Sequence, residues 1–210
     1  MKLYDYNGAS NPRRVRIFIA EKSINIETIQ VDLASGQQFS DEYKKINPYC
    51  VVPTLLLDDG TAIGEVPVIC RYLEEIYPDH PLIGSTAEER AIISMWERRI
   101  ELDGYFSVVD ATRNSNSNLK GHAVTGPHSY EQIPALAERG KKRTFSFFED
   151  LNSLLEKHSY AACDHFSIAD ITAVVAIDLA KKRLDITPDS ALTHLHRWYK
   201  AVSARPSMKA

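Results

Sequence analysis

A short apolar run that begins at a proline constrains this chain more than any other stretch. Val52-Pro53 precedes the run Leu55–Leu57, and Asp58-Asp59-Gly60 follows it with the residues of a tight turn. Because proline has no N–H to give to a ladder, it is confined to strand starts, edges and bulges. The pattern predicts a strand that begins just after Pro53 and leaves the backbone groups of Val52 to bind something outside the sheet. The isomer of the Val52–Pro53 bond stays open at this stage.

A carboxylate follows the turn, at the start of a predicted helix. Glu65 precedes a segment with helical spacing of apolar residues, which are Val66, Val68, Ile69, Tyr72, Leu73 and Ile76. A carboxylate beside free helical N–H groups suits a zwitterionic ligand, because the acid binds the amine while the amides bind the ligand's carboxylate.

The first 77 residues alternate between strand and helix patterns. Strands are predicted at 2–6, 26–31, 55–57 and 62–63, and helices from Pro12 to about residue 22, at 40–46 and at 66–76. Pro12 suits the first helical position, with Ser10 or Asn11 as its N-cap. The order β-α-β-α-β-β-α predicts a compact α/β domain of the thioredoxin type.

The second half has no clear strand pattern. We predict a thioredoxin-like domain at 1–77, a linker with two prolines at 78–85, and an all-α helical bundle at 86–210. Thr86 and Glu89 resemble a capping box, and Ser167 and Asp170 form a second one beside the staple residues Phe166 and Ile171. Helices are predicted at 86–100, 136–155, 168–180 and 192–202, with a loop at 113–130.

Composition excludes several classes of function. The formal net charge of −3 over 210 residues gives no electrostatic reason to expect nucleic acid or an anionic membrane as a partner. No long uncharged run and no signal-peptide core is present, so we expect a cytoplasmic protein. Three widely spaced cysteines with no Cys-x-x-Cys pairing argue against a disulfide framework or a structural zinc site. His194 and His196 have no acidic partner at ligand spacing, so no metal is predicted.

Taken in order, these features resemble the cytosolic glutathione S-transferase family over essentially the whole chain. The resemblance depends on Val52-Pro53, on Glu65 with Arg71-Tyr72-Leu73 behind it, and on Phe166-Ser167-Ile168-Ala169-Asp170. We expect a bacterial member, with a first turn closest to the beta, nu and zeta classes.

The resemblance implies a glutathione site. Val52 would bind the cysteinyl backbone of glutathione, held by cis-Pro53, and Glu65 with the Val66 amide would bind the γ-glutamyl end. The family usually has Ser or Thr after the glutamate, whereas this chain has Val66. Only the backbone N–H can serve there, and a lost hydrogen bond to a charged group is worth about 1.5–3 kcal/mol.

Chemistry of this kind needs a thiolate, which a donor at a helix N-terminus stabilises. Ser10 and Asn11 occupy that place, before Pro12. Gly8-Ala9-Ser10 resembles the beta-class turn, Asn11 resembles the asparagine of nu-class relatives, and the zeta and theta serine falls on Ala9. We rank Ser10 first and Asn11 close behind, each with a simple N-cap as the alternative. Tyr4 and Tyr6 are rivals, although their strand pattern favours packing.

Other residues are candidates for the glycyl end of glutathione and for the electrophile. Gln38 and Lys44 are candidates for the glycyl carboxylate of glutathione, with surface exposure as the alternative for each. Four residues of the first bundle helices are candidates for the electrophile pocket: Met95, Trp96, Arg99 and Phe106.

The predicted function is glutathione transfer to small hydrophobic electrophiles, with glutathione as co-substrate and no metal. Glutathione-dependent disulfide reduction, suggested by Asn11, and a non-catalytic glutathione-binding or protein-interaction module remain alternatives, because one fold hosts several functions. The resemblance also implies a homodimer.

Overall fold

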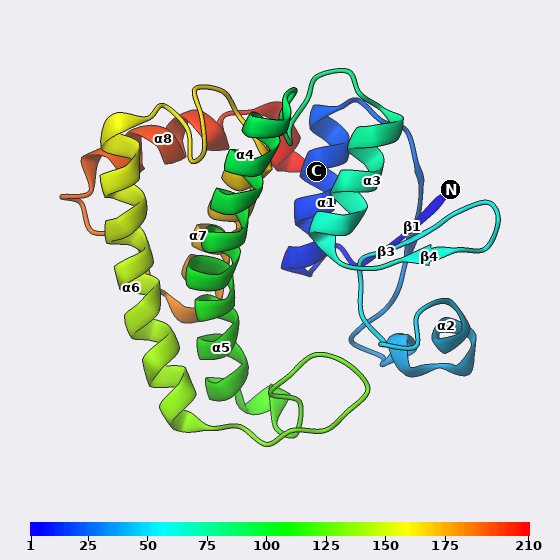
Figure 1. Ribbon diagram of the computed structural model, residues 1–210. Helices are drawn as coiled ribbons and strands as arrows, with labels where there is room; N and C mark the ends of the chain where they lie inside the picture. The colour runs from blue at the N-terminus through cyan, green and yellow to red at the C-terminus, as the bar shows by residue number, and fades with distance from the viewer. The chain divides into compact units, whose positions relative to one another are not determined.

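The computed structural model describes residues 1–210 and divides the chain into two compact units (Figure 1). The first comprises residues 1–80, 124–129 and 210, and the second comprises residues 81–123 and 130–209. No helix is both long enough and apolar enough to cross a membrane.

The first unit is a four-stranded mixed sheet with helices. Its elements are β1 (Lys2–Asp5), α1 (Ser10–Glu21), β2 (Glu27–Gln30), α2 (Asp41–Ile46), β3 (Thr54–Leu56), β4 (Ala62–Ile63) and α3 (Val66–Ile76), with a 3-10 turn η1 (Gln37–Phe39) before α2. The strand order is β2-β1-β3-β4, with β1 parallel to β2 and antiparallel to β3. The predicted β-α-β-α-β-β-α order is confirmed.

The core of the first unit lies between the sheet and helices α1 and α3, which pack against each other. Leu3 and Leu55 from the sheet, Phe18 from α1, and Ile69 and Leu73 from α3 are all fully buried. These residues follow the period of two in the strands and the helical period in α1 and α3, so the sequence pattern and the core agree.

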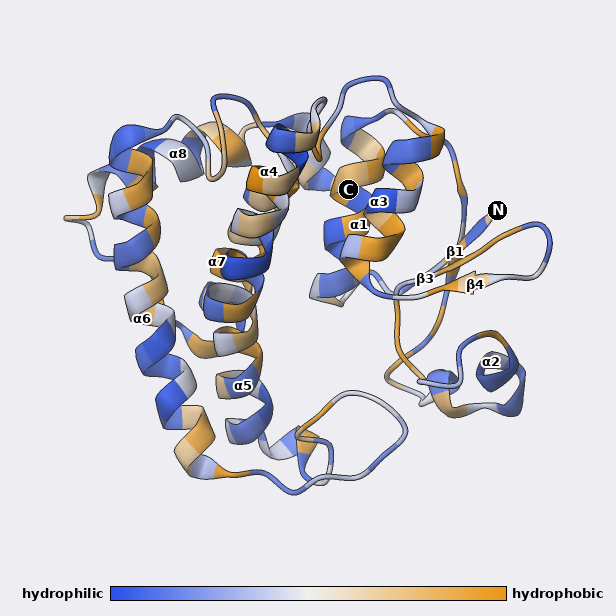
Figure 2. Ribbon diagram, in the orientation of Figure 1, coloured by the Kyte–Doolittle hydropathy of each residue, from blue (hydrophilic) through white to orange (hydrophobic).

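The second unit is helical. It contains α4 (Ala87–Arg99), a π-helical turn η2 (Ile100–Tyr105), α5 (Phe106–Ser115), η3 (Ser117–Leu119), α6 (Pro134–Lys157), α7 (Ile168–Leu184), α8 (Thr193–Ser203) and η4 (Pro206–Lys209). The helix α5 was not predicted. It follows α4 through η2 with no intervening loop, so no turn residues in the sequence separate the two helices. Hydrophobic and hydrophilic residues alternate along α6 (Figure 2), as expected of a helix with one buried face.

Helices α5 and α6 approach each other closely at a glycine. A Cβ atom at Gly140 would lie 2.6 Å from the Ser107 carbonyl oxygen and 2.7 Å from the Ala111 backbone nitrogen. Only a residue without a side chain therefore fits at this crossing.

A buried carboxylate joins α7 to α8 and to the loop before α7. Asp170 Oδ1 accepts hydrogen bonds from Ala161 N at 2.9 Å and Trp198 Nε1 at 2.7 Å. Its Oδ2 accepts from Ser167 N at 3.0 Å and Ser167 Oγ at 3.1 Å, so the carboxylate returns the bond as the capping-box pattern predicts. Burial raises the pKa of Asp170.

Candidate functional site

Three segments of the first unit meet at one end of the sheet's strands. Tyr4, near the end of β1, pairs with Thr54 at the start of β3, and Leu55 pairs with Ile63 at the end of β4. Because β3 is antiparallel to both neighbours, the chain leaving β1, the chain entering β3 and the chain leaving β4 lie at the same end of the strands. The chain leaving β1 leads to Ser10, the chain entering β3 comes from Val52, and the chain leaving β4 leads to Glu65.

Helix α1 begins at Ser10, two residues earlier than predicted. Ala9 is the N-cap, no side chain caps the helix, and Pro12 is its third residue. The expectation that Ser10 or Asn11 is the N-cap is therefore wrong, because both already lie within the helix. The first turn holds no acidic residue, so no side-chain carboxylate offsets the positive end of the helix dipole there.

The turn that precedes α1 is held by a buried carboxylate. Asp5, whose side chain is fully buried, accepts from Arg16 Nη1 and Gln30 Nε2, each at 2.7 Å. Gln30 Oε1 in turn accepts from the Asn7 backbone N–H at 3.0 Å. Arg16 therefore forms an ion pair within the first unit. Together these hydrogen bonds fix the position of the chain where it enters α1.

The orientation of the Asn11 amide follows from its neighbour. Arg14, which is buried, donates from Nη1 to Asn11 Oδ1 at 3.1 Å. A guanidinium has donors only, so the amide must present its oxygen to Arg14. The Nδ2 donors of Asn11 are thereby turned away from Arg14.

The Val52–Pro53 peptide bond is cis. Neither backbone group of Val52 forms a hydrogen bond within the chain. The neighbouring backbone is held in place: Val51 O accepts from Tyr43 Oη at 2.7 Å and from Asn47 Nδ2 at 3.1 Å. Asn47 Nδ2 also donates to Thr54 Oγ1 at 2.8 Å. No sequence pattern marks Tyr43 and Asn47 as positioning residues, because no motif links residues of α2 to the start of β3.

Burial raises the pKa of Tyr43 to about 12, so its hydroxyl remains a donor. Because the folded-state pKa exceeds the unfolded value near 10, the stabilisation is complete below about pH 10. We expect the free energy of unfolding to fall by about 2–3 kcal/mol as the pH rises from about 10 to about 12. Urea denaturation across this range should show a shallower pH dependence for Tyr43→Phe. Tyr49→Phe, at a residue 73% exposed, is the matched control, and equal slopes for the two variants would contradict the assignment.

Glu65 has a strained backbone and an exposed side chain. Its φ is 62° and its ψ 125°, values that a residue with a side chain seldom adopts. Its carbonyl oxygen accepts from Val68 N and Ile69 N, while its carboxylate has no partner in the chain. Pro67 has no N–H, so the Val66 amide is the free backbone donor at the start of α3.

Gln38 and Lys44 lie in η1 and α2, beyond the end of β2. The Oε1 atom of Gln38 is buried with no hydrogen-bond partner. Lys44 is exposed and lies 3.9 Å from Asp41 Oδ1, as an (i, i+3) pair on the same helix. Of the two, Gln38 has the polar atom that needs a partner.

Tyr4 and Tyr6 pack in the first unit. Both lie against a cluster of buried residues formed by Val31, Tyr43 and Val52, and the rings of Tyr4 and Tyr43 meet edge to face at 5.8 Å between centroids. The packing interpretation is confirmed for both tyrosines.

The four candidates for the electrophile pocket lie in the second unit. Met95 and Phe106 are 48% and 39% exposed, and the Arg99 guanidinium lies over the Trp96 ring at 5.8 Å from its centroid. The exposed apolar side chains stay available to a hydrophobic ligand. One group with metal-binding side chains also lies in this unit, namely Glu89, Cys163 and His165.

Comparison with known families decides the relationship. A model of the glutathione S-transferase N-terminal domain matches residues 10–76, and a model of the glutathione S-transferase C-terminal domain matches residues 101–206. The chain belongs to the glutathione S-transferase family.

Individual relatives of this glutathione S-transferase cover nearly all of the chain. Glutathione S-transferase 2 of Saccharomyces cerevisiae is 29% identical over 100% of this chain and 88% of its own length. Maleylacetoacetate isomerase of Dictyostelium discoideum is 32% identical over 93% of this chain and 86% of its own length.

Solved structures agree with this relationship. A glutathione S-transferase domain-containing protein of Marinobacter aquaeolei VT8 is 34% identical, with a TM-score of 0.87 over 99% of this chain and 100% of its own. Gtt2 of Saccharomyces cerevisiae is 28% identical, with a TM-score of 0.90 over 100% of this chain and 99% of its own. The thioredoxin-like first unit and the helical second unit are therefore those of the family.

Proposed function

We propose that this enzyme activates the thiol of glutathione as a thiolate and transfers it to small hydrophobic electrophiles. The observation that carries the proposal is that the N–H and C=O of Val52, beside cis-Pro53, form no hydrogen bond within the chain. Both groups lie at the end of the strands from which the chain leads into α1. An extended peptide bound there forms two backbone hydrogen bonds, as an added strand does.

Glu65 and the Val66 amide complete the binding of the γ-glutamyl end. The unpartnered carboxylate binds the ligand's amine, and the free amide at the helix start binds its carboxylate. Glu65 has a strained backbone, and its side chain has no partner within the chain. The two observations together support a role in binding. Gln38 is a candidate for the glycyl end through its Nε2 donors, since a carboxylate only accepts hydrogen bonds. The buried Oε1 of Gln38, which has no partner in the chain, needs a donor instead, such as a backbone N–H of the ligand.

The thiolate is stabilised by the start of α1. The uncapped N-terminus contributes its dipole, and the Ser10 hydroxyl and the Asn11 amide contribute hydrogen bonds. The bond to Arg14 supports Asn11, because it leaves the Nδ2 donors for the sulfur. In the reaction the sulfur forms a bond to the electrophilic carbon, the leaving group departs with its electron pair, and the thiol proton passes to solvent.

Variants of Ser10 and Asn11 test the activation of the thiol. We expect alanine at the principal donor to lower kcat with a chloronitroarene by about 10²–10³-fold. The same variant should raise the pKa of the bound thiol, measured from thiolate absorbance against pH. The variant at the second position, with a smaller effect on both quantities, is the internal control. Unchanged turnover in both variants would contradict the role of α1.

Substrate choice distinguishes the alternatives. Activity only with a mixed hydroxyethyl disulfide favours disulfide reduction, and binding of glutathione with no turnover favours a non-catalytic module. The relative named maleylacetoacetate isomerase adds a second candidate, isomerisation of a cis double bond. There the thiolate adds to the double bond, the resulting single bond rotates, and the same thiolate leaves, so the product contains no sulfur. We also propose a homodimer, as the family resemblance implies.

A further inference from the structure

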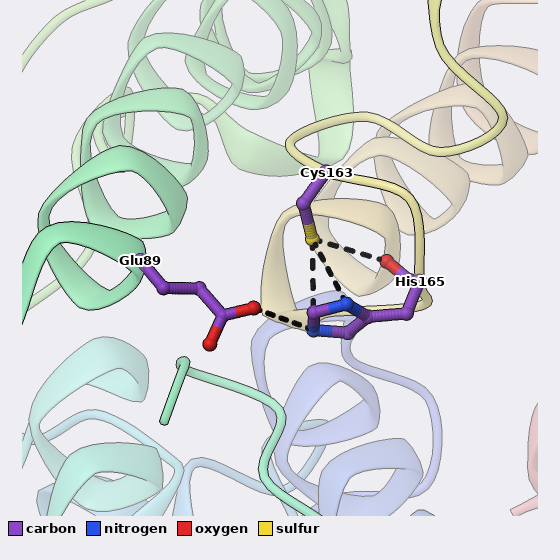
Figure 3. A group of neighbouring side chains, drawn as sticks. All are labelled: Glu89, Cys163 and His165. Carbon is purple, nitrogen blue, oxygen red and sulfur yellow. Dashed lines mark hydrogen bonds and ion pairs between the residues drawn. The ribbon is translucent and has the colours of Figure 1, made fainter. Parts of the chain in front are cut away.

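Three metal-binding side chains of the second unit lie together (Figure 3). Glu89 belongs to the first turn of α4, and Cys163 and His165 lie in the loop between α6 and α7. One ligand atom from each residue lies within 4.8 Å of the others. The glutathione chemistry proposed above uses none of them.

Two of the three distances between these atoms fit a tetrahedral ion. Cys163 Sγ lies 3.6 Å from His165 Nε2, and His165 Nε2 lies 3.5 Å from Glu89 Oε1. Around a zinc ion with Zn–S near 2.3 Å and Zn–N or Zn–O of about 2.0–2.2 Å, neighbouring ligand atoms are about 3.4–3.6 Å apart. Thiolate, imidazole and carboxylate are also the three ligand types that zinc takes in proteins.

The segments that carry the ligands are held without an ion. Glu89 Oε2 accepts from the Ser85 backbone N–H at 2.6 Å, which leaves Oε1 facing His165. The loop that carries Cys163 and His165 is held by Asp170, which accepts from Ala161 N before these two residues and from Ser167 N after them. The loop is thus fixed at both ends, so the ligands are brought together by the fold and an ion would add to an existing arrangement.

We propose that Glu89, Cys163 and His165 bind one Zn²⁺ per chain, with water in the fourth position. The thiol proton passes to solvent as the Zn–S bond forms. The sulfur lies 3.6 Å from both ring nitrogens, so the His165 ring turns about its Cβ–Cγ bond to direct Nε2 at the ion. The side chain is 46% exposed, which leaves room for this rotation. The ion clamps the loop before α7 to the start of α4.

Zinc titration of the full chain, purified without a histidine tag and with its cysteines reduced, tests the site. Calorimetry should give one Zn²⁺ per chain, and zinc should raise the melting temperature. Substitution of Co²⁺ should produce a sulfur-to-cobalt charge-transfer band in the near ultraviolet, which Cys163→Ser abolishes. Absence of zinc binding at micromolar concentrations overturns the proposal.

Variants separate this site from adventitious binding. Cys163→Ser, His165→Ala and Glu89→Gln should each weaken zinc binding at least about tenfold, since even outer-shell changes cost 10–100-fold. The glutamine keeps an oxygen for the Ser85 N–H, so the cap of α4 survives. His158→Ala and Glu88→Gln, at exposed residues outside the cluster, are the matched controls. Equal affinity in the ligand and control variants would show that zinc binds elsewhere and overturn the assignment.

Discussion

Replacing Glu65 by glutamine is expected to weaken glutathione binding about ten- to hundredfold. The proposed site places the Glu65 carboxylate against the ligand's ammonium group, and a hydrogen bond between charged groups is worth about 1.5–3 kcal/mol. The glutamine has the same size, so the backbone at φ 62° is retained and only the charge is lost. Calorimetric titration with glutathione measures the effect.

Glycine at the same position separates binding from backbone strain. Glu65→Gly should also lose binding, yet it should raise the free energy of unfolding by about 1 kcal/mol, because glycine adopts positive φ without strain. A gain in stability with a loss of binding is the usual mark of a residue retained for function. Wild-type affinity in both variants would remove Glu65 from the proposed site.

The second large effect concerns the stability of the helical unit. Asp170→Ala leaves the Ala161 and Ser167 amides, the Ser167 hydroxyl and the Trp198 indole N–H without their acceptor in a fully buried place. We expect a loss of about 3–5 kcal/mol in the free energy of unfolding, since buried donors without partners keep their desolvation cost. The melting temperature should fall by about 10 °C.

Urea denaturation followed by circular dichroism measures this loss. Asp150→Ala, at an exposed aspartate of α6, is the control and should change the free energy of unfolding by less than about 0.5 kcal/mol. If Asp170→Ala lost no more than the control, the hydrogen bonds to this carboxylate would contribute nothing net to folding.

Local patterns determined most of the fold. The alternation in β1, the turn Asp58-Asp59-Gly60 and the helical spacing after Glu65 each specify an element within a few residues, and those elements formed where predicted. Boundaries were less secure. Helix α1 starts at Ser10 because Ala9, a residue with no capping side chain, is the N-cap, which the preference for polar caps does not predict.

The candidate site was accessible to sequence only in part. Val52-Pro53 and Glu65 were found because proline and a helix-start carboxylate carry local signals. Tyr43 and Asn47 were not found, because their role depends on hydrogen bonds to Val51 O that join α2 to the start of β3. A contact between segments leaves no periodic mark in either of them.

By itself, then, the sequence determined the α/β and helical halves, the capping box at Ser167 and Asp170, and the family, because these depend on neighbours along the chain. The predicted box at Thr86 and Glu89 formed only in part, since Thr86 Oγ1 accepts from Glu89 N but the Glu89 carboxylate accepts from Ser85 N and not from the N-cap Thr86 N. Only the tertiary structure decided that Tyr43 and Asn47 donate to Val51 O, and that Glu89 lies against Cys163 and His165. Such arrangements join residues through packing across the fold, and their energies depend on distance and burial that no spacing in the chain encodes.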